Sequence, residues 1–221
     1  MAGMLSPSVM CADLLNLQNE IEELDSLGVE FLHIDFMDNK FVPNITFDTN
    51  MVKSFKRAMK NIRRDIHLMA FEPQQFFDAM EISKGDMVSV HFEACEDVSS
   101  VLAEIRSRGA SPCLAISPDT PVNVVKDFMS EVDAFLLMTV YPGFAGQPMA
   151  PGSMERLAEL RSIVDECGRD IKIEVDGHVS WDHCAEMREN GADIFVAGSS
   201  SVYGKQYPLD EAVKMFYRLV K

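Results

Sequence analysis

The sequence has few cysteines and no long uninterrupted run of apolar residues. Five cysteines occur among 221 residues, with neither a CxxC pair nor the spacing of a disulfide framework. Scattered free thiols are typical of a reducing compartment, so we expect a cytoplasmic protein. A transmembrane helix needs about 18 consecutive apolar residues, which this chain lacks, and its first residues do not resemble a signal peptide. We therefore expect no membrane partner.

Basic residues are also scarce relative to acidic ones. Lysine and arginine together number 20 against 35 aspartates and glutamates, which gives a formal net charge of −15. This charge repels nucleic acids and anionic membrane surfaces, so we expect neither as a partner. An anionic ligand would have to be held by local backbone N–H groups against the overall field.

The chain also lacks a GxGxxG turn, a fixed-period repeat and low-complexity tracts, which argues against a dinucleotide-binding fold and a solenoid. Short apolar runs instead alternate with longer amphipathic segments. The pattern predicts strands at Met4–Val9, Glu30–Phe36, Asp65–Met69, Met87–His91, Pro112–Ser117, Ala134–Val140, Ile171–Asp176 and Ile194–Gly198. The predicted helical stretches between them include Leu14–Leu27, Asn50–Lys60, Pro73–Ile82, Val98–Arg108, Met154–Cys167 and Trp181–Glu189, with Pro208–Val220 closing the chain. Eight βα units without a break in composition predict a single α/β domain over residues 1–221, a (β/α)8 TIM barrel.

Four metal-ligating residues occur near the ends of three predicted strands. Alternate residues of a strand share a face, so His33 and Asp35 can reach one cation together. His67 and Asp176 would complete the set, because strand ends meet at the catalytic rim of a barrel. Two imidazoles and two carboxylates suit zinc, iron, manganese or cobalt, and magnesium stays open. Such an ion polarises a carbonyl, while carboxylates on opposite sides of a substrate can invert a stereocentre.

Glycine-containing loops follow the last three predicted strands. Gly143 and Gly146 lie three residues apart, Gly177 is followed by His178, and Gly198 is followed by Ser199. Glycine lets the backbone approach an anion closely, and the last loops of a barrel are its usual phosphate site. We therefore predict phosphate binding by these loops.

Three methionines stand beside the candidate ligands at strand ends. Met37, Met69 and Met138 would form a polarisable apolar lining that keeps water from a reactive intermediate. Ordinary core packing is the competing interpretation.

As a set, these motifs resemble the ribulose-phosphate 3-epimerase family. The resemblance runs in order from Ser6 to Ser199. The matching segments are Ser6-Pro7-Ser8, His33 to Asp38, Phe41-Val42-Pro43-Asn44, His67-Leu68-Met69, Met138 to Gln147, Glu174 to Gly177 and Ala197-Gly198-Ser199. The family implies a (β/α)8 barrel, one divalent metal, no organic cofactor and epimerisation at C3 of a ketose phosphate.

The resemblance also implies roles for individual residues. His33, Asp35, His67 and Asp176 match the metal ligands, with Asp35 as proton acceptor and Asp176 as proton donor through a metal-stabilised cis-enediolate. The substrate-contacting residues implied by the family or by position are Ser8, Met37, His67, Met69, Met138, Gly143, Phe144, Ala145, Gly146, Gly177, His178, Gly198 and Ser199. Relatives are often oligomers, so a homo-oligomer is implied without a named surface.

Several positions differ from the usual family pattern and bear on the substrate. Asn39 and Lys40 replace Gly and His, and His178 replaces a second Gly after the Asp-Gly pair. The run Met10 to Leu15, Thr139 and Ala145 look more like the allulose-6-phosphate 3-epimerases. We therefore expect D-allulose 6-phosphate and D-fructose 6-phosphate as the substrate pair, with D-ribulose 5-phosphate and D-xylulose 5-phosphate as the alternative.

Two other classes stay as weaker alternatives. A lyase on the same barrel would be expected to place a catalytic Asp-x-Lys pair near a strand end. A non-catalytic sugar-phosphate sensor would not need both proton carriers and all four ligands.

Overall fold

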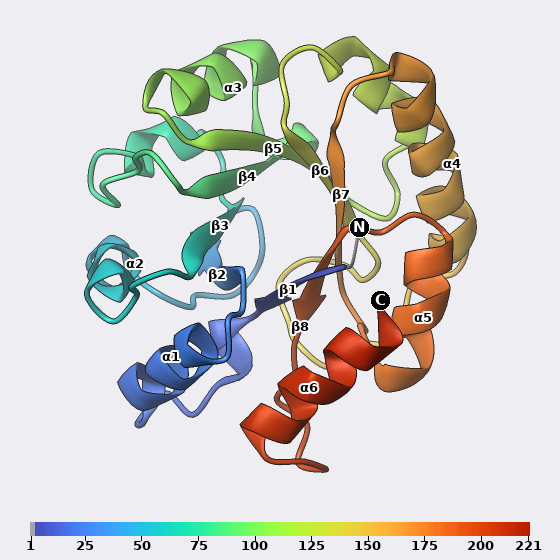
Figure 1. The fold of residues 1–221 in the computed structure, drawn as a ribbon. Coiled ribbons are helices and arrows are strands. Elements are labelled where there is room, and N and C mark those ends of the chain that lie inside the picture. The colour runs from blue at the N-terminus through green and yellow to red at the C-terminus, as the bar shows by residue number, and fades with distance from the viewer. Residues whose placement is uncertain (1–2) are drawn as a thin grey trace.

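The computed structural model describes residues 3–221, which form a ring of eight parallel strands surrounded by helices (Figure 1). The strands are β1 Met4–Pro7, β2 Phe31–Met37, β3 Arg63–Met69, β4 Met87–His91, β5 Ser111–Ile116, β6 Ala134–Met138, β7 Lys172–Asp176 and β8 Ile194–Ala197. Each strand from β2 to β7 pairs with the next strand in the chain, and β8 also pairs with β1. A parallel bridge between Ser8 and His33 links β1 to β2. The predicted (β/α)8 barrel is confirmed.

The helices form an outer layer around the strands (Figure 1). The α-helices are α1 Leu17–Ser26, α2 Thr49–Ser54, α3 Val98–Ser107, α4 Ser153–Cys167, α5 Trp181–Glu189 and α6 Leu209–Leu219. Short 3-10 helices are η1 Val9–Cys11, η2 Phe55–Arg57, η3 Pro73–Phe76, η4 Phe92–Ala94 and η5 Val122–Phe128. Among the described residues, no helix combines the length and apolarity that crossing a membrane requires.

The predicted helix over Pro73–Ile82 is wrong, because only the 3-10 helix η3 forms there. The buried Arg64 guanidinium donates to the carbonyl oxygens of Met80 and Glu81 at 3.0 Å each. Glu81 also adopts a left-handed conformation, with φ +51°. The segment therefore wraps around a buried cation, and its turns close mainly through bonds spanning three residues.

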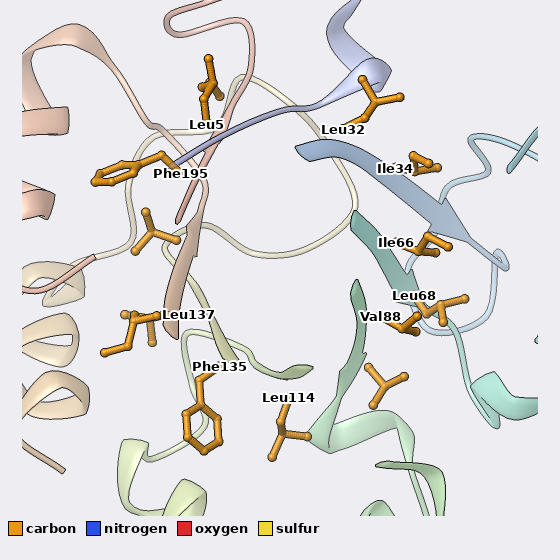
Figure 2. Packing of buried hydrophobic residues seen from close by; sticks show 14 of the residues in the cluster. Leu5, Leu32, Ile34, Ile66, Leu68, Val88, Leu114, Phe135, Leu137 and Phe195 are labelled. Atoms are coloured by element: carbon orange, nitrogen blue, oxygen red, sulfur yellow. The ribbon is translucent and has the colours of Figure 1, made fainter. Parts of the chain in front are cut away.

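Strand alternation separates two sets of side chains. One set points outward from the ring of strands, toward the helices, as Figure 2 shows for Leu32 and Ile34 of β2 and for Ile66 and Leu68 of β3. The residues between them, including His33 and Asp35, face the barrel interior because successive side chains of a strand alternate. The apolar layer between the strands and the helices therefore fixes the positions of the polar side chains inside the barrel.

A buried carboxylate near the end of α1 binds the segment just before β3. Asp25 accepts backbone N–H groups from Lys60 at 2.7 Å and from Asn61 and Ile62 at 3.0 Å each. Burial alone would raise the pKa of Asp25, but these N–H donors outweigh it and hold the pKa below its usual range.

Asp25→Asn is expected to destabilise the barrel by about 1–3 kcal/mol at about pH 7, because an amide cannot accept all these charge-assisted bonds. A lowered carboxyl pKa stabilises the fold above the unfolded-state pKa, and this contribution is lost as pH falls through the folded-state pKa. The difference between the two proteins should therefore narrow in urea titrations as pH is lowered to about 3. Glu23→Gln, on the exposed side of the same helix, is the matched control. Equal unfolding free energies at about pH 7 would contradict this account.

Candidate active site

The register of β2 and β3 places three candidate ligands together at the carboxyl end of the barrel. Asp35 pairs with His67 across the two strands, and His33 precedes Asp35 on the same inward face. The Asp35 Oδ1 atom lies 3.4 Å from His33 Nε2 and 3.3 Å from His67 Nδ1. Both histidines are fully buried, so one carboxylate oxygen lies between two buried imidazole nitrogens.

The last strand residue of β7 supplies a second carboxylate. Asp176 Oδ2 lies 3.6 Å from His67 Nδ1 and 3.9 Å from His33 Nε2. One ligand atom from each of the four residues lies within 4.8 Å of the others. His33 Nε2 is buried and has no hydrogen-bond partner within residues 3–221. Because this orphaned nitrogen faces two carboxylates, the cluster fits a divalent cation.

The two carboxyl groups have opposite pKa shifts. Burial raises the pKa of Asp176 to about 6, with His33 opposing the shift and the Asp35 charge adding to it. Burial also acts to raise the pKa of Asp35, but His33 and His67 outweigh it and hold that pKa far below its usual range. The pair therefore divides into a charged carboxylate and a carboxyl that retains its proton more readily, which is the pattern of an acid and a base.

Ser8 orients one of these carboxylates. Its hydroxyl donates to Asp35 Oδ2 at 2.6 Å, which leaves Asp35 Oδ1 turned toward the histidines. Met37, Met69 and Met138 are buried at the ends of β2, β3 and β6, and all three line the pocket above the cluster. The structure thus places the three methionines beside the candidate acid and base.

The glycine-containing loops after β6, β7 and β8 line the same pocket. The sequence-predicted residues that line it in these loops are Gly143, Phe144, Ala145, Gly146, Gly177, His178, Gly198 and Ser199. A Cβ atom at Gly146 would lie 3.9 Å from Ser199 Oγ, so two of these loops are adjacent. A Cβ atom at Gly177 would approach Val140 to 2.7 Å, so the loop after β7 needs glycine for its close packing. The loops after β6, β7 and β8 therefore line one concave pocket.

The positions that differ from the family pattern are accommodated by unusual backbone conformations. Asn39 has φ +58° and His178 has φ +48°, so both keep a left-handed turn without glycine. His178 Nδ1 lies 3.0 Å from the carbonyl oxygen of Gln147, and a donated bond there would join the loops after β7 and β6. Lys40 is exposed and is not among the residues that line the pocket.

Sequence reasoning missed the groups behind the two histidines. Asp65 Oδ2 lies 2.6 Å from His33 Nδ1 and accepts the Ser6 hydroxyl at 2.7 Å. His91 Nε2 lies 2.8 Å from His67 Nε2. Asp65 is two residues before His67 on the same strand face, so the alternation that links His33 to Asp35 could have identified it. His91 ends β4, and its partner is apparent only from the packing of β3 against β4.

Another missed residue is Glu174, which faces the barrel interior two residues before Asp176. Its carboxyl is fully buried beside Asp65, and no hydrogen-bond partner is assigned to either of its oxygens within residues 3–221. Burial raises the pKa of Glu174 well above its usual range, and the nearby Asp65 charge adds to this. Glu174 is therefore a carboxyl that retains its proton more readily than an exposed glutamate, and it lies below the cluster.

A (β/α)8 barrel with paired carboxylates and histidines at its carboxyl rim defines a barrel enzyme with proton-transfer groups. The model of the "Ribulose-phosphate 3 epimerase family" matches residues 4–203. Over 202 residues the chain is 37% identical to the ribulose-phosphate 3-epimerase of Bacillus subtilis, covering 91% of this chain and 92% of that protein. It is 34% identical over 197 residues to that of Escherichia coli K12, covering 89% and 88%. The chain belongs to the ribulose-phosphate 3-epimerase family and is an isomerase, a carbohydrate epimerase.

Solved structures of low sequence identity share the fold alone. A thiamine phosphate pyrophosphorylase from Pyrococcus furiosus superposes with a TM-score of 0.67 at 12% identity, covering 99% of this chain and 95% of that one. A 3-hexulose-6-phosphate synthase superposes with a TM-score of 0.66 at 13% identity, covering both chains completely. These similarities support the barrel architecture independently of the family match.

Proposed function

We propose that this protein, a ketose-phosphate 3-epimerase, interconverts D-ribulose 5-phosphate and D-xylulose 5-phosphate. The observation that carries the proposal is that two carboxylates, Asp35 and Asp176, line one pocket with the glycine-containing loops and lie beside two buried histidines. Inversion at a carbon next to a ketone needs a base on one side and an acid on the other.

We assign the proton transfers to the two carboxylates in the roles that the family resemblance implies. Asp35, oriented by the Ser8 hydroxyl, takes the proton from C3, and the electron pair of the broken C–H bond moves into an enediolate. Asp176 delivers a proton to the opposite face of C3, which restores the ketone with inverted configuration. The two residues exchange roles in the reverse direction. A divalent cation held by His33, Asp35, His67 and Asp176 would supply Lewis-acid stabilisation of the developing negative charge.

The remaining pocket residues would bind and protect the sugar phosphate. Backbone N–H groups in the loops after β6, β7 and β8 would hold the phosphate against the net negative charge of the protein. Met37, Met69 and Met138 would exclude water from the enediolate, which limits loss of the intermediate to side reactions.

The substrate pair distinguishes this proposal from the hexulose alternative. The curated relatives quoted above are named for ribulose phosphate, and they match nearly the whole chain. The features that resemble the allulose-6-phosphate branch include Met10, Cys11 and Ala145, and all three line the pocket. A hexulose phosphate is therefore the second candidate, and it would need room for one more carbon between the metal cluster and the phosphate loops.

A kinetic comparison separates the two candidates. We expect kcat/KM for D-ribulose 5-phosphate to exceed that for D-allulose 6-phosphate by about 10-fold or more, because one misplaced carbon displaces either the phosphate or C3. Both assays should use one metal-loaded preparation, so that occupancy cannot differ between them. A preference for the hexulose phosphate would overturn the proposed substrate, and turnover of neither would overturn the proposed reaction.

A further inference from the structure

The two buried histidines of the cluster differ in what contacts the ring nitrogen turned away from it. The outer nitrogen of His33, Nδ1, meets a carboxylate directly, because Asp65 Oδ2 lies 2.6 Å away. The outer nitrogen of His67, Nε2, meets another imidazole, because His91 Nε2 lies 2.8 Å away. A histidine that binds a metal through one nitrogen carries its proton on the other, so the outer partner decides which nitrogen is available.

The contact between His67 and His91 is a hydrogen bond between ring edges. The ring centroids lie 5.0 Å apart, much farther than the two Nε2 atoms, so the nitrogens point toward each other. Both side chains are fully buried. One nitrogen must therefore donate and the other accept, because two donors or two lone pairs facing each other at this distance would repel.

The far side of His91 determines the direction of that bond. His91 Nδ1 lies 3.2 Å from Glu93 Oε2 and 3.4 Å from the Ser117 hydroxyl. The same carboxylate accepts the Ser117 backbone N–H at 2.9 Å and the Thr120 hydroxyl. An ionised carboxylate only accepts, so it favours a proton on His91 Nδ1. His91 Nε2 then carries a lone pair and accepts from His67 Nε2–H, which leaves the His67 Nδ1 lone pair facing Asp35 and Asp176.

We propose that His91 and Glu93 are positioning residues that fix His67 as the Nε2–H tautomer and so present His67 Nδ1 to a divalent cation. This inference rests on the metal site of the proposed function. The reverse polarity would require a proton on His67 Nδ1, where it would block a metal, and a lone pair of His91 facing the Glu93 carboxylate. The arrangement also predicts that the two histidines contribute differently to metal affinity. A charged carboxylate contacts the outer nitrogen of His33, whereas a neutral imidazole contacts the outer nitrogen of His67.

The direct test is the tautomer of His67 in the Zn²⁺-loaded wild-type protein, because without an ion the Asp35 carboxylate, 3.3 Å from His67 Nδ1, would itself favour a proton there. Long-range ¹H–¹⁵N correlations at mildly alkaline pH distinguish the two neutral tautomers of each imidazole, and His67→Gln identifies the signals of His67 by their loss. The expected result is Nε2–H for His67 and Nδ1–H for His91. A proton on His67 Nδ1 alone would overturn the proposal, whether or not any variant folds.

Cobalt binding provides the second test. His91→Phe keeps a ring in the same place but removes the acceptor, and it should weaken Co²⁺ affinity by about 10–100-fold in competition with a chelator. His91→Gln restores an acceptor near the Nε2 position and should recover most of that loss. Ser89→Ala alters the preceding inward-facing residue of β4 and should leave Co²⁺ affinity unchanged. Unchanged affinity in His91→Phe, or equal losses in all three variants, would overturn the proposal.

Neither measurement depends on turnover, so the two claims fail separately. If the wild-type protein shows the expected tautomers and the expected cobalt series but epimerises neither sugar phosphate, the proposed function fails and the positioning role stands. If it epimerises a ketose phosphate but carries the opposite tautomer at His67, the positioning role fails alone.

Discussion

Asp176→Asn is expected to lower kcat by about 10³-fold or more while leaving the barrel folded. The asparagine cannot deliver a proton to C3, and it also replaces a charged ligand of the cluster with a neutral one. Asp176 occupies the last position of β7, and its side chain is 18% exposed, above the apolar layer that holds the strands. The substitution should therefore abolish proton delivery without disturbing the packing of the core.

A matched control substitution is available just before the start of β7. Asp170 is exposed just before β7 and pairs with Lys172 at 2.5 Å, far from the strand end that carries Asp176. Asp170→Asn should keep wild-type kcat, and both variants should give the same circular dichroism spectrum. Wild-type turnover by Asp176→Asn would refute its role as proton donor.

Removal of the divalent metal is the second change with a large expected effect. Lewis-acid stabilisation of the developing charge contributes several kcal/mol, so a chelator-stripped preparation should lose about 10³-fold in kcat/KM. The free protein should also melt at a lower temperature, because an ion at 100 times its Kd stabilises the fold by about 2.7 kcal/mol.

Reloading tests whether the loss is specific. Adding back Zn²⁺, Fe²⁺, Mn²⁺, Co²⁺ or Mg²⁺ separately, with K⁺ as the negative control, should restore activity and melting temperature together for the ions that fit two imidazoles and two carboxylates. Full activity in the stripped protein, verified free of metal by elemental analysis, would contradict a metal-dependent reaction.

Strand alternation accounts for how much of this site could be predicted from the sequence. His33 and Asp35 are two residues apart in an apolar, β-prone run, so a shared inward face follows from strand geometry alone. Asp176 ends a predicted strand, and the carboxyl ends of the strands of a parallel barrel meet at one rim. The sequence therefore predicts that Asp176 lies near the other three ligands. Local periodicity thus predicted the fold and placed the four candidate ligands at one end of it.

The features that could not be predicted depend on contacts between distant segments. The segment after Pro73 has an amphipathic pattern, but it forms only the 3-10 helix η3 and wraps around the buried Arg64 guanidinium, which comes from β3. The contact between His67 and His91 depends on the packing of two neighbouring strands, and no spacing in the sequence specifies it. The choice between a pentulose and a hexulose depends on the depth of a pocket formed by several loops, to which single substitutions are a weak guide.

The central claim is that a proton is removed from C3 of a ketose phosphate and replaced from the other side. Incubating the metal-loaded protein with D-ribulose 5-phosphate in D₂O tests it most directly, because carboxyl groups exchange their protons with solvent. We expect D-xylulose 5-phosphate with one deuterium at C3, detected by mass spectrometry and by loss of the C3 proton signal in NMR. A sugar phosphate that keeps its C3 proton in every molecule, under conditions where the metal is bound, would contradict the account.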